Sequence, residues 1–122
     1  MNTTATIIYP DWNTKACVVH NRELNDDWEQ VNEYALFSYE TCICVYREYA
    51  DGSCELEFNT GGYQHSATTS KHFRWFVSEC LNYRMETFVR SLMKGCKSTA
   101  EFLGTHARLS ISADRQTYVQ KE

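Results

Sequence analysis

The chain has 122 residues, of which 43% are hydrophobic, and a formal net charge of −4. Because this length and composition suffice for one modest hydrophobic core, the sequence predicts a single domain over residues 1–122. No run of 18 apolar residues is present, which excludes an obvious transmembrane helix. The N-terminus lacks the cationic start and apolar run of a secretory signal. We therefore expect a cytoplasmic protein with no membrane partner.

Six cysteines lie at positions 17, 42, 44, 54, 80 and 96. An even number suits a disulfide framework, but such frameworks are typical of small secreted chains with little core. We therefore expect reduced and mostly buried thiols. The Cys42-x-Cys44 pair has no second close pair, which is weak evidence for a zinc site. The sequence thus predicts no metal and no cofactor.

The first third of the chain predicts two short strands followed by an acidic stretch. Residues 4–9 and 16–20 are rich in β-branched side chains, and Pro10 marks the turn between them. The acidic stretch favours either a solvated loop or a short helix over residues 27–32. Trp28 is unusual in these surroundings and suggests an acidic and aromatic surface for a partner. The candidate partner-binding residues are Glu23, Asp26, Asp27, Trp28, Glu29 and Glu33.

A β-hairpin is predicted next. Residues 34–39 and 41–49 are rich in aromatic and β-branched side chains, which predicts one long strand or two strands joined by a bulge near Glu40. Asp51-Gly52 is typical of a two-residue type I′ loop that leads into the next strand. Such a loop pairs Val45 with Phe58. Alternation along the two strands then predicts a core face composed of Ile43, Val45, Cys54, Leu56 and Phe58.

The second half of the chain predicts one long helix. Hydrophobic residues recur with a helical period from Phe73 to Leu92, and Gly95 ends the pattern. A hydroxyl of Thr68, Thr69 or Ser70 supplies the N-cap. We therefore expect a helix over residues 70–94, with a kink or two successive helices as the alternative.

The remaining elements are short. Ser98 predicts the cap of a short helix over residues 99–103, residues 109–112 alternate as a strand does, and residues 114–122 are expected to form a frayed tail. The fold class predicted is α+β, with a small antiparallel sheet packed against one long C-terminal helix plus short helices.

The expected start of the long helix gathers groups that can bind an anion. Thr69, Ser70, Lys71 and His72 place two hydroxyls, an ammonium and an imidazole beside backbone N–H groups. The alternative is a plain helix cap with a few further hydrogen bonds. Nucleophilic catalysis is not indicated, because Cys80 lies about two turns from His72 and falls on the apolar stripe. The sequence therefore predicts no catalytic residue and no enzyme.

Charge is spread unevenly along the chain. Residues 1–61 carry three basic side chains against eleven acidic ones, whereas residues 62–122 carry nine against five. Either the two halves pack on each other, or a second copy packs head to tail, so a homodimer is among the expected partners. A charged partner is the other explanation. The basic residues of the helical region 70–97 raise the alternative of a nucleic-acid-binding module.

Two segments carry a resemblance. Phe37-Ser38-Tyr39-Glu40-Thr41, a hairpin, and then the segment from Tyr63 to His72 resemble the pattern of a family of small uncharacterised proteins of phages and their hosts. The shared pattern is Ser-Tyr-x-Thr, two strands, and Ser-x-Thr-Thr-Ser/Thr-Lys/Arg-His, and it covers roughly residues 36 to 80. The resemblance implies an origin in a phage or mobile element, but it supplies no activity and no catalytic residue.

These observations predict a small, non-enzymatic protein of a phage that binds a host protein in the host cytoplasm. Inhibition of a bacterial defence system of the CRISPR type is the expected form of that activity. The acidic half of the chain suits a target with a basic nucleic-acid channel, because complementary charge steers association.

Overall fold

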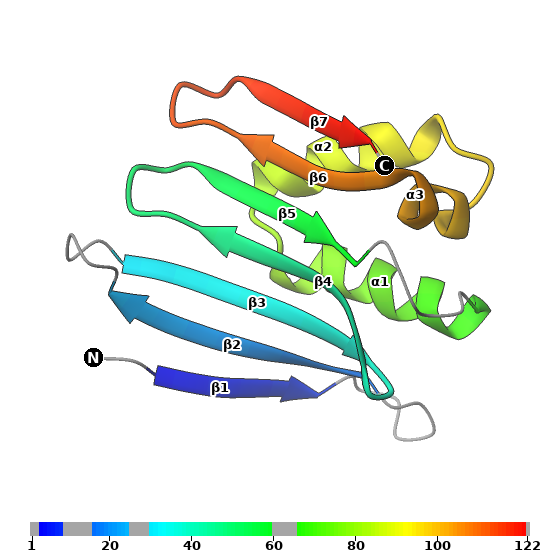
Figure 1. Cartoon of the computed structure of the whole chain (residues 1–122), viewed down its shortest axis with the longest axis horizontal. Helices are drawn as coiled ribbons and strands as arrows, with labels where there is room; N and C mark the ends of the chain where they lie inside the picture. The colour runs from blue at the N-terminus through cyan, green and yellow to red at the C-terminus, as the bar shows by residue number, and fades with distance from the viewer. Residues whose placement is uncertain (1–2, 9–15, 25–29, 60–65, 122) are drawn as a thin grey trace.

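Seven strands of the described residues form one antiparallel sheet, and each strand pairs with its neighbours in the sequence (Figure 1). The computed structural model describes residues 3–8, 16–24, 30–59 and 66–121. The strands are β1 (Thr3–Ile8), β2 (Ala16–Leu24), β3 (Gln30–Ser38), β4 (Thr41–Glu48), β5 (Cys54–Phe58), β6 (His106–Ile111) and β7 (Thr117–Lys121). The two strands expected near the N-terminus are confirmed. The single or bulged strand expected over residues 34–49 is wrong, because a turn at Tyr39 and Glu40 separates β3 from β4, which pair antiparallel. The helix expected over residues 27–32 is wrong from Gln30 onward, because β3 begins there; the expected turn at Pro10 lies outside the described residues.

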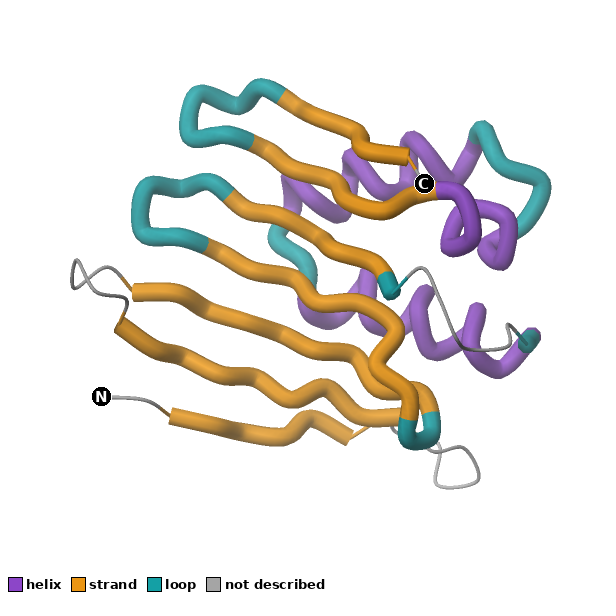
Figure 2. Tube along the Cα trace, viewed as in Figure 1, coloured by secondary structure: helices purple, strands orange, loops and turns teal. Residues whose placement is uncertain are grey.

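Three helices lie between β5 and β6 in the sequence. They are α1 (Ala67–Cys80), α2 (Tyr83–Lys94) and α3 (Thr99–Thr105). In Figures 1 and 2, α1 and α2 lie behind the sheet and α3 lies at its right-hand end, whereas no described helix crosses the near side. We call this uncovered side the open face. The core lies between the sheet and the helices, and Phe73, Phe76 and Phe102 are fully buried there.

The predicted arrangement of a small sheet against one long C-terminal helix is wrong. The sheet has seven strands in the described residues, and the longest helix has 14 residues. The helical pattern is interrupted at Leu81, whose backbone is extended. Asn82 then caps α2, because its side chain accepts a hydrogen bond of 2.8 Å from the Met85 N–H. The alternative of two successive helices is thus confirmed. The hydrophobic period continues through both helices, so periodicity alone does not select this alternative over one long helix.

Tyr46 of β4 fastens the break between the helices to the sheet. Its ring is fully buried, and its hydroxyl donates to Glu48 Oε2 at 2.8 Å and accepts the Asn82 N–H at 3.4 Å. The Asn82 amide also donates to the Cys54 sulfur at 3.8 Å. Burial, followed by the neighbouring Cys54 and Glu48, raises the pKa of the Tyr46 hydroxyl, which is therefore protonated at neutral pH. One side chain thus links β4 to the start of α2.

The β4–β5 hairpin has a three-residue loop instead of the predicted two-residue loop. Tyr49 exchanges backbone hydrogen bonds with Ser53 and Gly52, and Gly52 has a φ of +90°. This geometry is that of a hairpin whose turn ends in a left-handed residue, the position that favours glycine. The register therefore shifts by one residue, and Val45 lies opposite Glu57 instead of Phe58.

A bulge in β4 completes the correction of the core face. Leu36 pairs with Cys44 and Phe37 pairs with Cys42, which leaves Ile43 as an extra residue. Ile43 and Cys44 are consequently both buried, although they are adjacent. Beyond the bulge, Cys44 and Tyr46 face the helices, whereas the predicted core residue Val45 faces the open side.

The C-terminal residues predicted to fray form β7. A turn between β6 and β7 is closed by a 2.9 Å hydrogen bond from the Ser112 N–H to the Gln116 carbonyl, and the Ser112 hydroxyl donates to Asp114. The short helix after Ser98 is confirmed, and the Ser98 hydroxyl accepts the Glu101 N–H at 3.1 Å. Local hydrogen bonds thus order a segment with few hydrophobic residues.

We predict that Tyr46→Phe lowers the free energy of unfolding by about 1–3 kcal/mol, because the Asn82 N–H and the Glu48 carboxylate lose a buried partner. Urea unfolding followed by circular dichroism measures this change. Tyr83→Phe is the matched control, because Tyr83 is 81% exposed beside the same junction. Equal stability of the two variants would contradict the role given to the Tyr46 hydroxyl.

Candidate functional site

A cluster of ion-paired side chains crosses four strands of the open face. Each member lies opposite another member, or next to one, in the antiparallel register. We call this set the open-face cluster. Its members are Glu33 of β3, Arg47 of β4, Glu55 and Glu57 of β5, and Arg108 of β6.

Arg47 lies at the centre of the cluster. Its Nε atom is 3.0 Å from Glu33 Oε2, and its Nη1 atom is 3.4 Å from Glu55 Oε1 and 3.3 Å from Glu57 Oε1. The guanidinium therefore joins strands on both of its sides. Such a planar donor with several N–H groups suits simultaneous contact with several carboxylates.

Arg108 forms the second centre. Its Nη2 atom is 2.6 Å from Glu57 Oε2, and its Nη1 atom is 3.6 Å from Glu55 Oε2. The Tyr49 hydroxyl adds a hydrogen bond of 2.6 Å to Glu55 Oε1. Both Glu55 and Glu57 consequently bind two arginines each, so the five side chains hold one another in fixed positions.

The pKa values reflect these contacts. The hydrogen bond from Arg108 is the largest influence on Glu57 and, with Arg47, lowers the pKa of its carboxyl below the ordinary value. Burial first, and then the Glu55 carboxylate, raises the pKa of Tyr49 to about 12. The Glu57 carboxyl is therefore charged at neutral pH. The cluster provides paired charges for recognition, whereas acid–base catalysis requires a carboxyl or another group that titrates near neutrality.

The predicted acidic partner site is only partly described. Glu33 belongs to the open-face cluster, and the backbone of Glu23 pairs with that of Val31. Asp26, Asp27, Trp28 and Glu29 lie outside the described residues. The sequence alone did not identify the other four members of the cluster. Without knowledge of their partners, Glu55 and Glu57 look like ordinary solvent-exposed carboxylates of a surface strand. The correct register, which places Arg47 opposite Glu55, is the signal that identifies them.

The predicted anion-binding residues do not share one surface. Ser66 is the cap of α1, earlier than predicted, and its hydroxyl accepts the Thr69 N–H at 3.1 Å. Thr69, Ser70 and His72 are buried, whereas Lys71 is exposed. The hydroxyls, imidazole and ammonium that an anion would need together are therefore separated between the core and the surface.

His72 joins two distant segments instead. Its Nδ1 atom is 2.8 Å from the Ser38 hydroxyl, and both residues are buried. The neighbouring Tyr39, at the start of the β3–β4 loop, has its ring centre 6.1 Å from that of His72 and a φ of +58°. The two segments that carry the sequence resemblance therefore meet at a buried hydrogen bond, where α1 packs on the end of β3.

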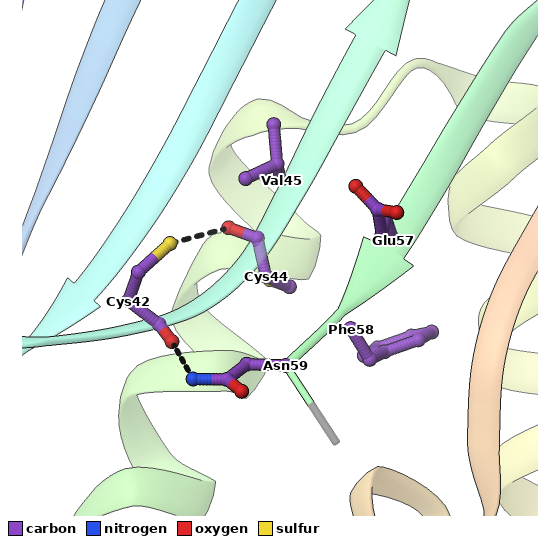
Figure 3. Close-up of a pocket in the computed structure, with 6 residues that line it drawn as sticks. All are labelled: Cys42, Cys44, Val45, Glu57, Phe58 and Asn59. Atoms are coloured by element: carbon purple, nitrogen blue, oxygen red, sulfur yellow. Dashed lines mark hydrogen bonds between the residues drawn. The ribbon is translucent and has the colours of Figure 1, made fainter. Parts of the chain in front are cut away.

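A hollow of about 240 Å³ is lined by residues of β4 beside its bulge and by residues at the end of β5 (Figure 3). The Cys42 thiol donates to the Cys44 carbonyl at 3.7 Å, and the Asn59 amide donates to the Cys42 carbonyl at 2.9 Å. Burial raises the pKa of both thiols and raises that of Cys80 to about 12. These thiols are protonated at neutral pH, whereas a nucleophilic or metal-binding cysteine requires the thiolate.

The basic residues of the region 70–97 are divided among separate elements. Arg84 donates to the Gly52 carbonyl at 3.0 Å, Arg90 binds Glu86 at 2.9 Å, and Arg74 donates to the Thr99 hydroxyl at 3.3 Å. The break between α1 and α2 prevents a single helical face from collecting them. None of the described helices has the length and apolar character of a membrane span.

Comparison with known proteins supplies a family but no activity. The model of a family of unknown function (DUF8033) matches residues 9–89, which include β2 to β5, α1 and part of α2. No curated protein and no solved structure matches the chain significantly.

We predict that Ser38→Ala lowers the free energy of unfolding by about 1–3 kcal/mol, because His72 loses a hydrogen bond inside the core. Ser91→Ala, at an exposed position of α2, is the control and is expected to change stability by less than about 0.5 kcal/mol. Thermal or urea unfolding measures both variants. A Ser38→Ala variant as stable as the control would show that the bond does not hold α1 to the sheet.

We further predict a pH-dependent effect of Arg108→Ala. Because the folded-state pKa of Glu57 is lowered, its stabilising contribution is present above the ordinary value of 4.5 and is lost as the pH falls through the folded-state pKa. Arg108→Ala should therefore lower the urea midpoint at pH 7 and have a smaller effect near pH ~3. Lys94→Ala, at an exposed position of α2, should change the urea midpoint by the same small amount at both pH values. An Arg108→Ala effect that is equal at both pH values would contradict the assignment.

Proposed function

We propose that the chain, which belongs to this family of unknown function, is a non-enzymatic module that binds a protein partner through the open face of its sheet. The observation that carries the proposal is the open-face cluster, which spans four strands on a side that no described helix covers. A flat face with fixed charges suits recognition of another folded surface.

The fixed positions of the charges favour binding. The side chains of Arg47 and Glu55 are 25% and 18% exposed, so they are partly withdrawn from water before a partner arrives. Glu57 and Arg108, at 40% and 42%, are more accessible. Because the mutual contacts already restrict the rotamers, a partner meets a smaller cost of ordering these side chains. When the partner excludes water, the electrostatic contacts also strengthen.

The charges indicate the chemistry of the partner. The cluster contains three carboxylates and two guanidinium groups, which leaves an excess of negative charge. A partner with an exposed basic patch therefore fits best. In the specific form of the proposal, that partner is a host protein whose basic channel binds nucleic acid, such as a bacterial defence effector, and binding inhibits it. This specific form is supported by the sequence resemblance to phage proteins.

Two structural features support binding over the alternatives. The described thiols of Cys42, Cys44 and Cys80 have raised pKa values, which is the opposite of nucleophilic activation. The three arginines of the helical region, Arg74, Arg84 and Arg90, already contact internal partners. Phosphate binding on the helices therefore has less support than protein binding on the sheet.

We predict that Glu57→Lys removes the partner. The tagged wild-type chain and the variant are expressed in the natural host cells, and co-purifying proteins are measured by quantitative mass spectrometry. The substitution breaks the ion pairs of Glu57 with Arg47 and Arg108 and leaves the cluster with an excess of positive charge, which repels a basic patch. A partner bound in stoichiometric amount by the wild type should therefore fall by about tenfold or more.

Glu86→Lys is the matched control, because Glu86 is also a glutamate paired with an arginine, but on α2. It should retain the partner. Circular dichroism establishes that both variants are folded. Loss of the partner in Glu86→Lys to the same extent, or the absence of a stoichiometric partner for the wild type, would contradict the proposal.

A further inference from the structure

The outer edge of β7 has the properties of an interface. Among the strands that the structure describes, β7 pairs only with β6, and its residues from Thr117 to Lys121 are all exposed. Two of the four large hydrophobic side chains exposed in the described part of the chain are found here, Tyr118 at 58% and Val119 at 43%. Tyr118 lies opposite Ser110 and Val119 lies opposite Leu109, so the two side chains are on different faces. A strand added to this edge would contact both.

The middle of this edge, from Thr117 to Gln120, has few of the features that discourage strand pairing, and the register shift of the β6–β7 pair lies at its end, between His106 and Arg108 of β6. Proteins protect exposed edges with proline, bulges or charges that point inward. β7 contains no proline, and its one charged residue, Lys121, is at its end. In Figure 1, β7 is the outermost strand on its side of the sheet, and the nearest helices lie behind the sheet, so its outer edge is open to another strand.

We propose that β7 pairs with β7 of a second copy of this chain, so that two seven-stranded sheets join around a two-fold axis. Antiparallel pairing of a strand with itself satisfies two-fold symmetry, because each copy contributes the same surface. Directly opposite residues must share a face of the joined sheet. This condition restricts the registers to those in which one residue of β7 lies opposite its own copy.

Charge and length then select one register. With Val119 on the axis, all five residues of β7 are paired, Tyr118 lies opposite Gln120 of the second copy, and Lys121 lies opposite Thr117 of the second copy. With Tyr118 on the axis, Lys121 instead lies opposite Arg115 of the second copy, and like charges repel. With Gln120 on the axis, only three residues of β7 are paired. The register centred on Val119 is therefore the favoured one.

Pairing with another copy of β7 is preferred over pairing with β1, the strand at the other edge of the sheet. A contact between β7 and β1 joins two different surfaces, and repeated addition produces an open chain of copies unless the ring closes. The β7–β7 contact closes after two copies. It also places both open faces on the same side, because the axis is perpendicular to the sheet. The pairing does not depend on the partner proposed for the open face.

Association through one five-residue strand is expected to be weak. Stable interfaces bury at least about 1,200 Å² in total, and a single short strand pair buries less than that. We therefore expect a dimer that forms as concentration rises. Sedimentation equilibrium of the full chain should show an average mass that increases from 14.3 kDa toward twice that value.

Val119→Lys tests the register. The substitution places two ammonium groups opposite each other at the axis, so the variant should remain monomeric at every concentration at which the wild type associates. Val119 is half exposed, and the substitution therefore leaves the core intact. Tyr83→Lys is the control, because Tyr83 is 81% exposed on α2 and should not alter association.

A cysteine cross-link provides the second test. Opposite residues of an antiparallel pair have Cα atoms about 4.5–5.5 Å apart, a separation that a disulfide can bridge. Under copper–phenanthroline, which oxidises two thiols to one disulfide, Val119→Cys should give a dimer linked through residue 119, identified by mass spectrometry. Thr117→Cys should not form a disulfide between its two copies, because residue 117 lies opposite Lys121 of the second copy.

Three results would overturn the proposal. They are a wild-type chain that stays monomeric across the concentration range, a dimer that persists in Val119→Lys, and cross-linking of Thr117→Cys as efficient as that of Val119→Cys. A failure of the open-face partner to bind has no bearing on these measurements, because they follow only the wild-type chain and substitutions outside the open-face cluster.

Discussion

The extra residue at Ile43 decides which side of the sheet each central side chain occupies. Side chains of a strand alternate, so one inserted residue reverses the faces of all residues that follow it. Because of the bulge, Tyr46 enters the core and reaches the break between the helices, whereas Arg47 reaches the open face. The attachment of the helices and the assembly of the open-face cluster thus depend on the same local feature of β4.

The two faces use polar groups differently. On the helix side, single buried hydrogen bonds such as Ser38–His72 and Tyr46–Asn82 fix the positions of helices, and each loss leaves a polar atom without its partner. On the open face, the ion pairs are partly exposed, and individual pairs of this kind contribute little to stability. In the proposed function, the shared positioning of these five side chains is what a protein partner recognises.

The sequence predicts the elements better than their arrangement. The α+β class, the N-terminal strands, the hairpin around Gly52 and the short helix after Ser98 all follow from residue preferences and caps. The helix break at Leu81 does not follow from them, because the hydrophobic period is unbroken. The N-cap of α2, Asn82, is a single polar residue among residues that favour a helix. The strand β7 does not follow from residue preferences either. It is ordered by its pairing with β6, and the composition of the segment does not predict that contact.

The candidate site was harder to predict for a related reason. Arg47, Glu55, Glu57 and Arg108 become a cluster only when the hairpin register is known, and that register depends on whether the loop has two or three residues. An error of one residue separates the opposite charges. Arg108 is also 51 residues from Glu57 in the sequence, so no local pattern connects the two.

That separation has a consequence for how the chain folds. Strands β2 to β5 pair with sequence neighbours, whereas β5 and β6 are separated by all three helices. Contacts between distant residues form late, because the entropy of closing the loop must be overcome first. During synthesis, the edge of β5 that pairs with β6 therefore remains unpaired until α1 to α3, and then β6, have emerged. Its side chains Glu55 and Glu57 then carry negative charge without Arg108, and charge at an exposed edge discourages association with other chains.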